Sequence, residues 1–260
     1  MNRNPLRPEL SLRAFAVWRR NFLVWRKLAI PSVLGNLADP MIYLFGLGYG
    51  LGSLLPEVAG VSYIAFLAAG TVCASTMNAA SFEALYSGFS RMHVQKTWEA
   101  IMNAPVSLDD VVAGEWLWAA TKATLSGTAI LVVITALGFV QSPLALWAVP
   151  TIFLIGLCFA ALGLIVTALA PSYDFFMYYF TLFVTPMTLL SGVFFPVDQL
   201  PSAVQSVAAV LPLAHAVQLV RPLLFGELPT GPWLHVAVLA AVALSAFAAA
   251  LVLTRRRLLT

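Results

Sequence analysis

Apolar residues fill most of this chain in long, nearly uninterrupted stretches. A helix needs about 20 apolar residues to cross the hydrocarbon core of a bilayer. Six stretches are this long, and we expect transmembrane helices at residues 33–55, 61–86, 115–139, 147–170, 175–195 and 233–254. An even number of spans leaves both termini on the same side. The pattern therefore predicts an all-α integral membrane protein with six transmembrane helices.

The composition excludes several classes of protein. Hydrophobic residues make up 61% of the chain and charged residues 10%, with a mean hydropathy of +0.90. Soluble domains have roughly a quarter charged residues, so much of this surface must face lipid. A soluble enzyme and a disordered chain are excluded. We expect no disulfide scaffold from two cysteines in apolar stretches, and no metal site from three scattered histidines.

Basic residues indicate the orientation in the membrane. Of the fourteen basic residues, Lys122 falls within the third predicted span and Arg221 falls on one side of the membrane. The other twelve fall on the opposite side: Arg3, Arg7, Arg13, Arg19, Arg20, Arg26, Lys27, Arg91, Lys96, Arg255, Arg256 and Arg257. The positive-inside rule then predicts cytoplasmic N- and C-termini. Because these residues flank apolar segments instead of lining one polar face, we expect no nucleic-acid partner.

Residues 8–29 precede the first span and interleave basic and aromatic side chains. The aromatics, which include Trp18, Phe22 and Trp25, recur at three- and four-residue spacing. This pattern is typical of a helix that lies in the headgroup region. The alternative is a simple positive-inside flank with tryptophans at the interface.

The long loop after the second span is predicted to contain a short amphipathic helix at 94–104. Apolar side chains gather on one side of it, and Glu99 lies beside them: these apolar residues are Val94, Trp98, Ile101 and Met102. The helix either caps the bundle or docks onto a cytosolic partner. In the second case Trp98 would anchor the contact, with Glu99 at its charged rim.

Six prolines divide residues 196–232 into short apolar segments. The segments 202–211 and 213–225 are too short to cross the membrane, so we expect a re-entrant helical hairpin on the external side.

One face of this hairpin is expected to be polar. His215, Gln218 and Arg221 recur every three residues, which predicts a common face. Arg221 either pairs with Asp198 or Glu227 and holds the hairpin, or it contacts a substrate directly.

Ionisable residues within the spans are costly and are candidates for function. Glu115 and Lys122 lie two helical turns apart, and Glu83 lies near the cytoplasmic end of the preceding span. They form either a static ion pair between helices or a charge network that transmits motion from the loop. Asp39, inside the first span, needs a hydrogen-bond donor, which Asn36 or a partner helix would supply.

Two glycine-related motifs bear on nucleotide binding. No lysine follows a glycine, so a GxxxxGK[ST] phosphate loop is excluded and ATP is not hydrolysed here by that route. Gly46, Gly48, Gly50 and Gly52 do not fit a dinucleotide fingerprint. Their spacing is instead typical of close helix packing in membranes.

Three segments resemble one known family: GNLADPMIYLFGLGYGLG at 35–52, NAPVSLDDVVAGEWLWAATKA at 103–123, and LLSGVFFPVDQLPSAVQSVAAVLPLAHAVQLVRPLLFG at 189–226. The chain resembles the type-2 ABC exporter permeases, and within them the nodulation protein J branch, which is associated with lipo-chitooligosaccharide export. The resemblance runs over nearly the whole chain. Glu115 and Lys122 stand where the family has such residues.

The resemblance implies a dimeric six-span permease with a separate ATPase subunit. Residues 8–29 would be its connecting helix, 94–104 its coupling helix and 197–225 its external re-entrant helices. The implied partners are two ATPase copies, which carry ATP and Mg, and a second copy of this chain. This chain itself would need no cofactor.

The function expected from the sequence is export of a lipo-oligosaccharide or other amphipathic glycolipid through the bacterial inner membrane. The chain would be a non-enzymatic, multi-pass permease. An ion-coupled secondary transporter would favour two inverted repeats, and the sequence has no internal repeat. Composition alone leaves a non-transporting membrane assembly protein as a further alternative.

Overall fold

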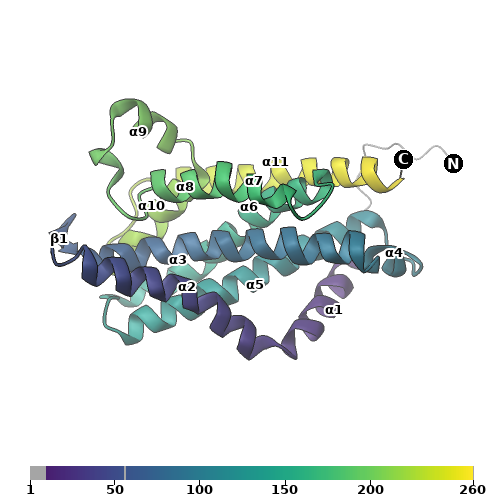
Figure 1. Ribbon diagram of the computed structural model, residues 1–260, viewed down its shortest axis with the longest axis horizontal. Coiled ribbons are helices and arrows are strands. Elements are labelled where there is room, and N and C mark those ends of the chain that lie inside the picture. The colour runs from purple at the N-terminus through teal and green to yellow at the C-terminus, as the bar shows by residue number, and fades with distance from the viewer. Residues whose placement is uncertain (1–9, 56, 260) are drawn as a thin grey trace.

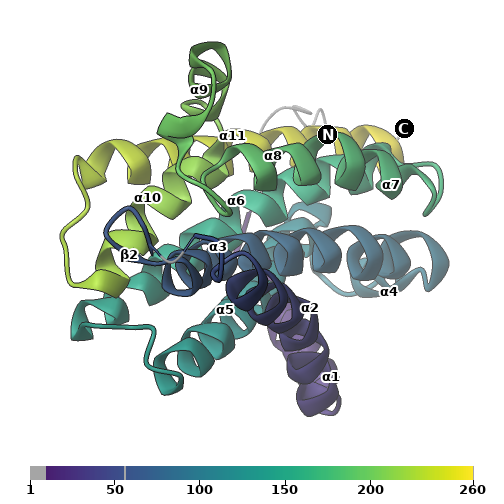
Figure 2. The same cartoon turned by 60° about the vertical axis from the view of Figure 1, so that its left-hand side comes forward.

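The computed structural model describes residues 10–55 and 57–259. Most of the long helices run roughly along one axis, with α4 and the end of α11 on one side and β1 on the other (Figure 1). The helices α1 and α2 cross this direction, as the turned view shows (Figure 2). Most of the elements are helical: α1 (Ala14–Arg26), α2 (Ala29–Gly50), α3 (Tyr63–Phe82), η1 (Glu83–Gly88), η2 (Ser90–Val94), α4 (Thr97–Met102), α5 (Leu108–Ala136), η3 (Pro143–Trp147), α6 (Ala148–Leu169), α7 (Phe175–Tyr179), η4 (Phe180–Val184), α8 (Thr185–Leu190), η5 (Val197–Gln199), α9 (Ser202–Ala208), α10 (Pro212–Phe225) and α11 (Pro232–Leu259). The strands β1 (Glu57–Val58) and β2 (Val61–Ser62) pair antiparallel.

Five helical segments are long and apolar enough to cross a membrane: Ala29–Gly50, Tyr63–Val94, Leu108–Ala136, Pro143–Leu169 and Pro232–Leu259. A shorter apolar helix, Phe175–Leu190, runs along the same axis in Figure 1. The segments α9 and α10 meet at 84°, as in a broken span or a re-entrant loop. The predicted all-α integral membrane fold is therefore confirmed, with five or six spans by length and composition.

Several helices differ in length from the predicted spans. The second span continues through the π turns η1 and η2 to Val94, and α5 begins at Leu108 instead of residue 115. The start of α5 is a capping box, in which Ser107 and Asp110 satisfy each other's backbone N–H groups. Asp109 and Asp110, which lie outside the predicted spans, thus belong to the first turn of a helix. The fifth segment ends at Leu190, before Gly192 with φ +78°.

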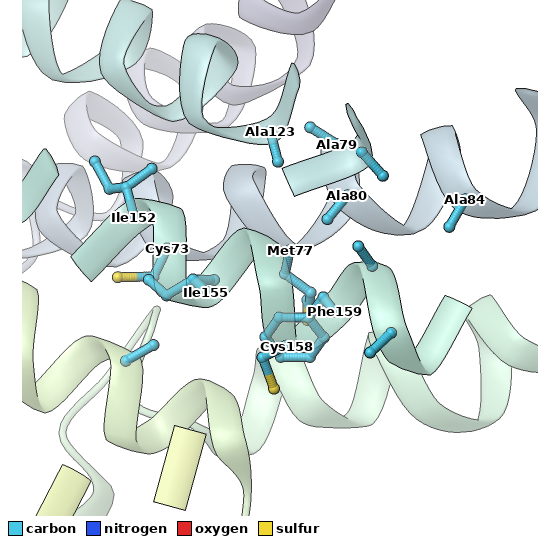
Figure 3. Close-up of a cluster of buried hydrophobic side chains, with 14 of the residues drawn as sticks. Cys73, Met77, Ala79, Ala80, Ala84, Ala123, Ile152, Ile155, Cys158 and Phe159 are labelled. Carbon is cyan, nitrogen blue, oxygen red and sulfur yellow. The ribbon is translucent and has the colours of Figure 1, made fainter. Parts of the chain in front are cut away.

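The core forms where α3, α5 and α6 pack together. Figure 3 shows Met77 of α3, Ala123 of α5 and Phe159 of α6 in one apolar cluster. Both cysteines, Cys73 and Cys158, are free and buried in it. Small residues let these helices approach closely, because side chains and backbone of neighbouring helices then come into direct contact.

The glycines of α2 differ in what they face. A Cβ at Gly48 would lie 2.7 Å from Ile64, whereas none would meet an atom within 4 Å at Gly46 or Gly50. A Cβ at Gly52 would meet the carbonyl of Gly48 in its own helix. Close packing within the chain therefore involves Gly48, while Gly46 and Gly50 lie on an open face of α2.

Gly156→Ala tests the close packing of α5 on α6. The new Cβ would lie 2.9 Å from the carbonyl oxygen of Ala120, which is backbone and cannot rotate away. We expect a loss of about 1–3 kcal/mol of stability, as is usual for overpacked cores. Thermal unfolding in detergent measures it. The matched control, Gly50→Ala, should unfold at the wild-type temperature or above, and equal midpoints for both variants would contradict this packing.

Candidate functional site

Four charged side chains form a buried cluster at the α4 end of the bundle. This charge cluster consists of Glu83 on η1, Arg91 on η2, and Glu115 and Lys122 on α5. Arg91 Nε lies 2.9 and 3.0 Å from the two carboxylate oxygens of Glu115, and Arg91 Nη2 lies 2.9 Å from Glu83 Oε1. Lys122 Nζ lies 2.6 Å from Glu83 Oε2. The four charges therefore alternate in sign along one chain of contacts.

Neutral donors complete the hydrogen bonding of both carboxylates. Trp118 Nε1 donates to Glu83 Oε1 at 2.8 Å, and Trp98 Nε1 donates to Glu115 Oε1 at 3.1 Å. Asn21 Nδ2 donates to the same Glu115 oxygen at 3.1 Å. Glu115 thus contacts side chains from α1, η2 and α4.

Both carboxylates of the charge cluster are buried, which makes their ion pairs important for stability. The side chains of Glu83 and Glu115 are only 3% and 2% exposed. Removing one partner of a buried ion pair leaves the other charge with neither water nor a countercharge beside it, which strongly destabilises the folded protein. The three helical elements that supply the charge cluster, η1, η2 and α5, are therefore held in one relative position.

The N-terminal helix α1 joins the cluster from outside the spans. Arg20 Nη1 donates to Asn21 Oδ1 at 2.9 Å, beside Glu115. Partial burial and the charge of Arg91 lower the pKa of Arg20. Ser11 binds Asp110 through both its backbone N–H (2.6 Å) and its hydroxyl (2.9 Å).

Of the predicted helix 8–29, residues 8 and 9 lie outside the described part of the chain, as do the basic residues Arg3 and Arg7.

The structure brings the predicted residues Glu83, Glu115 and Lys122 together through Arg91. Sequence reasoning missed Arg91, which was counted only as a basic loop residue. It also missed Asn21 and Trp118. A signal was present, since two buried carboxylates and a single lysine leave one negative charge uncompensated.

The position of Trp98 contradicts the expectation that this residue anchors a contact with a cytosolic partner. Its side chain is 1% exposed and bonded to Glu115, so it does not offer an apolar surface to a partner. The short helix turns Trp98 inward because the buried carboxylate of Glu115 accepts its N–H. Of the other residues predicted at 94–104, Ile101 and Met102 are half-buried against the core, while Val94 and Glu99 are exposed.

Arg221 makes neither predicted ion pair. Its guanidinium lies 3.7 Å from the centre of the Phe66 ring, and Nη2 donates to the carbonyl of Gly192 at 2.6 Å. Asp198 and Glu227 are exposed and form no ion pair within the described chain. Arg221 thus ties α10 to α3 and to the turn after α8.

The expected common face of the hairpin is also wrong. His215 is buried, with Nδ1 2.7 Å from Nδ1 of His235 on α11, whereas Gln218 is exposed. Residues spaced by three drift about 60° around a helix at each step. His215 contacts α11, Gln218 is exposed and Arg221 contacts Phe66 of α3, so the three side chains form no common polar face.

The basic residues near the C-terminus hold α11 against its neighbours, a role that the positive-inside rule does not predict. Arg255 forms an ion pair with Asp109 at the start of α5, and Arg257 Nη1 donates to carbonyls at the end of α6, the closest being Ala170 at 2.7 Å. Cations at the C-terminal end of a helix are favourable. These contacts join α11 to both neighbouring helices.

Comparison with known proteins identifies the family. Residues 13–225 match the family described as ABC-2 type transporter. The chain belongs to this family. It is 52% identical to nodulation protein J of Rhizobium leguminosarum bv. viciae over 97% of both chains. It is 53% identical to nodulation protein J of Rhizobium meliloti (strain 1021) over 94% of this chain and 93% of the relative.

A more distant member is the inner membrane transport permease YadH of Escherichia coli (strain K12), at 24% identity over 78% of each chain. This ABC-2 type chain is therefore a multi-pass membrane protein with a role in transport. The name of this relative, a transport permease, is consistent with a non-enzymatic role.

Arg91→Met tests the charge cluster of this ABC-2 type transporter. The variant keeps an unbranched apolar stem in place of the arginine methylenes but removes the guanidinium, which leaves two buried carboxylates with one lysine. We expect a loss of about 3–5 kcal/mol, measured as a lower midpoint of thermal unfolding in detergent. Lys96→Met is the matched control, because Lys96 is 69% exposed and lies 4.0 Å from Glu99. Similar midpoints for both variants would contradict a stabilising role for Arg91.

Proposed function

We propose that this chain is the membrane subunit of an exporter that moves a lipo-oligosaccharide or another amphipathic glycolipid out of the bacterial cytoplasm. A symmetric homodimer would work with two copies of a separate ATPase in the inner membrane. The resemblance to the nodulation protein J branch supports the substrate class. Membership in the ABC-2 type transporter family supports an ATPase partner.

The distribution of charge supports the orientation. Arg13, Arg91, Lys96 and Arg255 lie on segments at the α4 end of the bundle, and β1 and β2 lie at the opposite end (Figure 1). Under the positive-inside rule the α4 end faces the cytoplasm. Both termini would then be cytoplasmic, and the bent pair α9 and α10 would be external.

The charge cluster is the single observation that carries the mechanism. With no phosphate loop in this sequence, ATP and Mg would bind to the partner and the energy would enter mechanically at the cytoplasmic end. Trp98 connects α4 to Glu115, and the same carboxylate contacts Arg91 and Asn21. A displacement of α4 by the ATPase would therefore reach α1, η2 and α5 together.

The surface offered to the ATPase differs from the one the sequence favoured. Exposed residues near α4 are His93, Val94, Gln95, Lys96, Glu99, Ala100 and Asn103. We infer that these residues contact the ATPase, while Trp98 passes the movement inward as a positioning residue. The separation of the two roles follows from the opposite faces of α4.

The first test replaces a residue on the outer face of α4. We expect Glu99→Lys to reduce co-purification of the ATPase and vanadate-sensitive ATP turnover, while thermal unfolding of the permease stays unchanged, because Glu99 is exposed. Trp98→Ala should instead lower the unfolding temperature, since it removes a buried ring and a donor to Glu115. Glu57→Lys, at the opposite end, is the control and should retain the ATPase. Full ATPase binding by Glu99→Lys would refute this contact surface.

The second test concerns the dimer. Gly46 lies on the open face of α2, so Gly46→Leu should clash with a second copy but not within one chain. Native mass measurement of the permease with its ATPase should show a dimer for the wild type and a larger monomer fraction for the variant. Gly48→Leu is the comparison, because it clashes with Ile64 and should lower stability itself. A wild type that stays monomeric with its ATPase bound would overturn the dimer.

A further inference from the structure

A groove lined by both apolar and polar side chains opens halfway along the membrane-spanning helix α2. It has a volume of about 450 Å³ and lies between α2, α3, α5 and the segment η4–α8. Asn36 and Asp39 line it from α2, Asn78 from α3, Ser126 from α5 and Thr188 from α8. Small-molecule sites in proteins have volumes of this order.

Asp39 is the first reason to assign a ligand to this groove. It lies near the middle of the 22-residue helix α2, about 15 Å from either end. Its side chain is exposed, and it makes no hydrogen bond or ion pair with any described residue. A carboxylate at this depth is costly, so such residues mark substrate pathways or pair with other groups.

Pro40 adds a second acceptor beside this carboxylate. Proline lacks the N–H that residue 40 of a helix would donate to the carbonyl of residue 36. The carbonyl of Asn36 therefore lacks its usual helical donor, next to Asp39 in the groove. The two acceptors together call for a ligand that brings several hydrogen-bond donors.

Ser126 is an independent observation on the opposite wall. Its side chain is 2% exposed, and its hydroxyl is buried without a hydrogen-bond partner. A buried polar group without a partner is costly, and most such groups bind protein, water or ligand. Asn78, half-buried on α3, likewise makes no hydrogen bond with the described residues. Unsatisfied polar groups thus converge on the groove from three helices.

The chemistry of the walls selects the class of ligand. Asp39 can only accept hydrogen bonds, whereas Asn78 and Ser126 both donate and accept. Tyr43, Phe82 and Phe180 add aromatic surface to the same groove. Among the described lining residues Asp39 alone is charged, too few carboxylates for a metal cation. Hydroxyl and amide groups on a ring with apolar faces match these walls.

We propose that this groove binds the hydroxyl- and amide-rich saccharide headgroup of the transported glycolipid, with Asp39 accepting its hydrogen bonds. This assignment rests on the export function proposed above. Asp39 is exposed, so the groove is open at the surface of this chain and a headgroup can enter it from outside the bundle.

Equilibrium binding to the permease–ATPase complex in nanodiscs tests the assignment. The probes are an N-acylated chitooligosaccharide and the same oligosaccharide without its acyl chain. We expect Asp39→Asn to weaken binding of the acylated probe about tenfold or more, the effect of losing one charge-assisted hydrogen bond. Ser126→Ala should weaken it less. Glu57→Gln, a carboxylate outside the groove, is the matched control and should bind as the wild type does.

The probes separate the sources of the headgroup. Asp39-dependent binding of both probes supports recognition of the saccharide itself, and binding of the acylated probe alone, with the same loss in Asp39→Asn, supports a lipid-linked headgroup. Unchanged affinity in both Asp39→Asn and Ser126→Ala would overturn the groove. So would a loss of the dimer in Asp39→Asn, since the carboxylate would then serve a second copy of the chain.

The proposed function and the groove fail in different ways. If the wild-type complex binds neither probe and neither probe changes its ATP turnover, the export of such glycolipids is refuted and the groove with it. If the wild type binds the acylated probe but the two groove variants bind it equally well, the assignment of the groove alone is refuted. Should Asp39→Asn fail to fold, Ser126→Ala and Asn78→Leu decide the question.

Discussion

Arg91 is the cation shared by two carboxylates that are almost fully buried. Its guanidinium contacts Glu115 through two nitrogens and Glu83 through one, and Lys122 supplies the second positive charge. Burying two carboxylates without such partners would carry a large desolvation cost. The positions of α5, η1 and η2 depend on this one arrangement.

The same constraint explains the packing of the shorter elements. Trp98 faces inward because Glu115 accepts its indole N–H, and α1 lies against α5 where Asn21 reaches the same oxygen. Short helices such as α4, with 6 residues, gain little stability alone. Their contacts with a rigid buried group therefore decide where they lie, and the outer face of α4 is left free for a partner.

Asp39 and the charge cluster show two ways of placing charge in an apolar protein. In the cluster, opposite charges and tryptophan donors satisfy each carboxylate internally. In the groove beside α2, the carboxylate, the hydroxyl of Ser126 and the amide of Asn78 are left without partners from the described chain. A satisfied network stabilises one arrangement, whereas an unsatisfied one is available to a ligand. The two regions fit mechanical coupling and substrate contact, respectively.

Hydropathy by itself determined the all-α membrane fold, because lipid demands that every backbone polar group be satisfied within a helix. Spacing along one helix also placed Glu115 and Lys122 on a common face. Only the tertiary structure decided that Arg91 joins Glu83 to Glu115, that Trp98 points inward, and that Arg221 binds Gly192 instead of an acid. Each of these depends on which group approaches from another helix, and a linear pattern does not contain that distance.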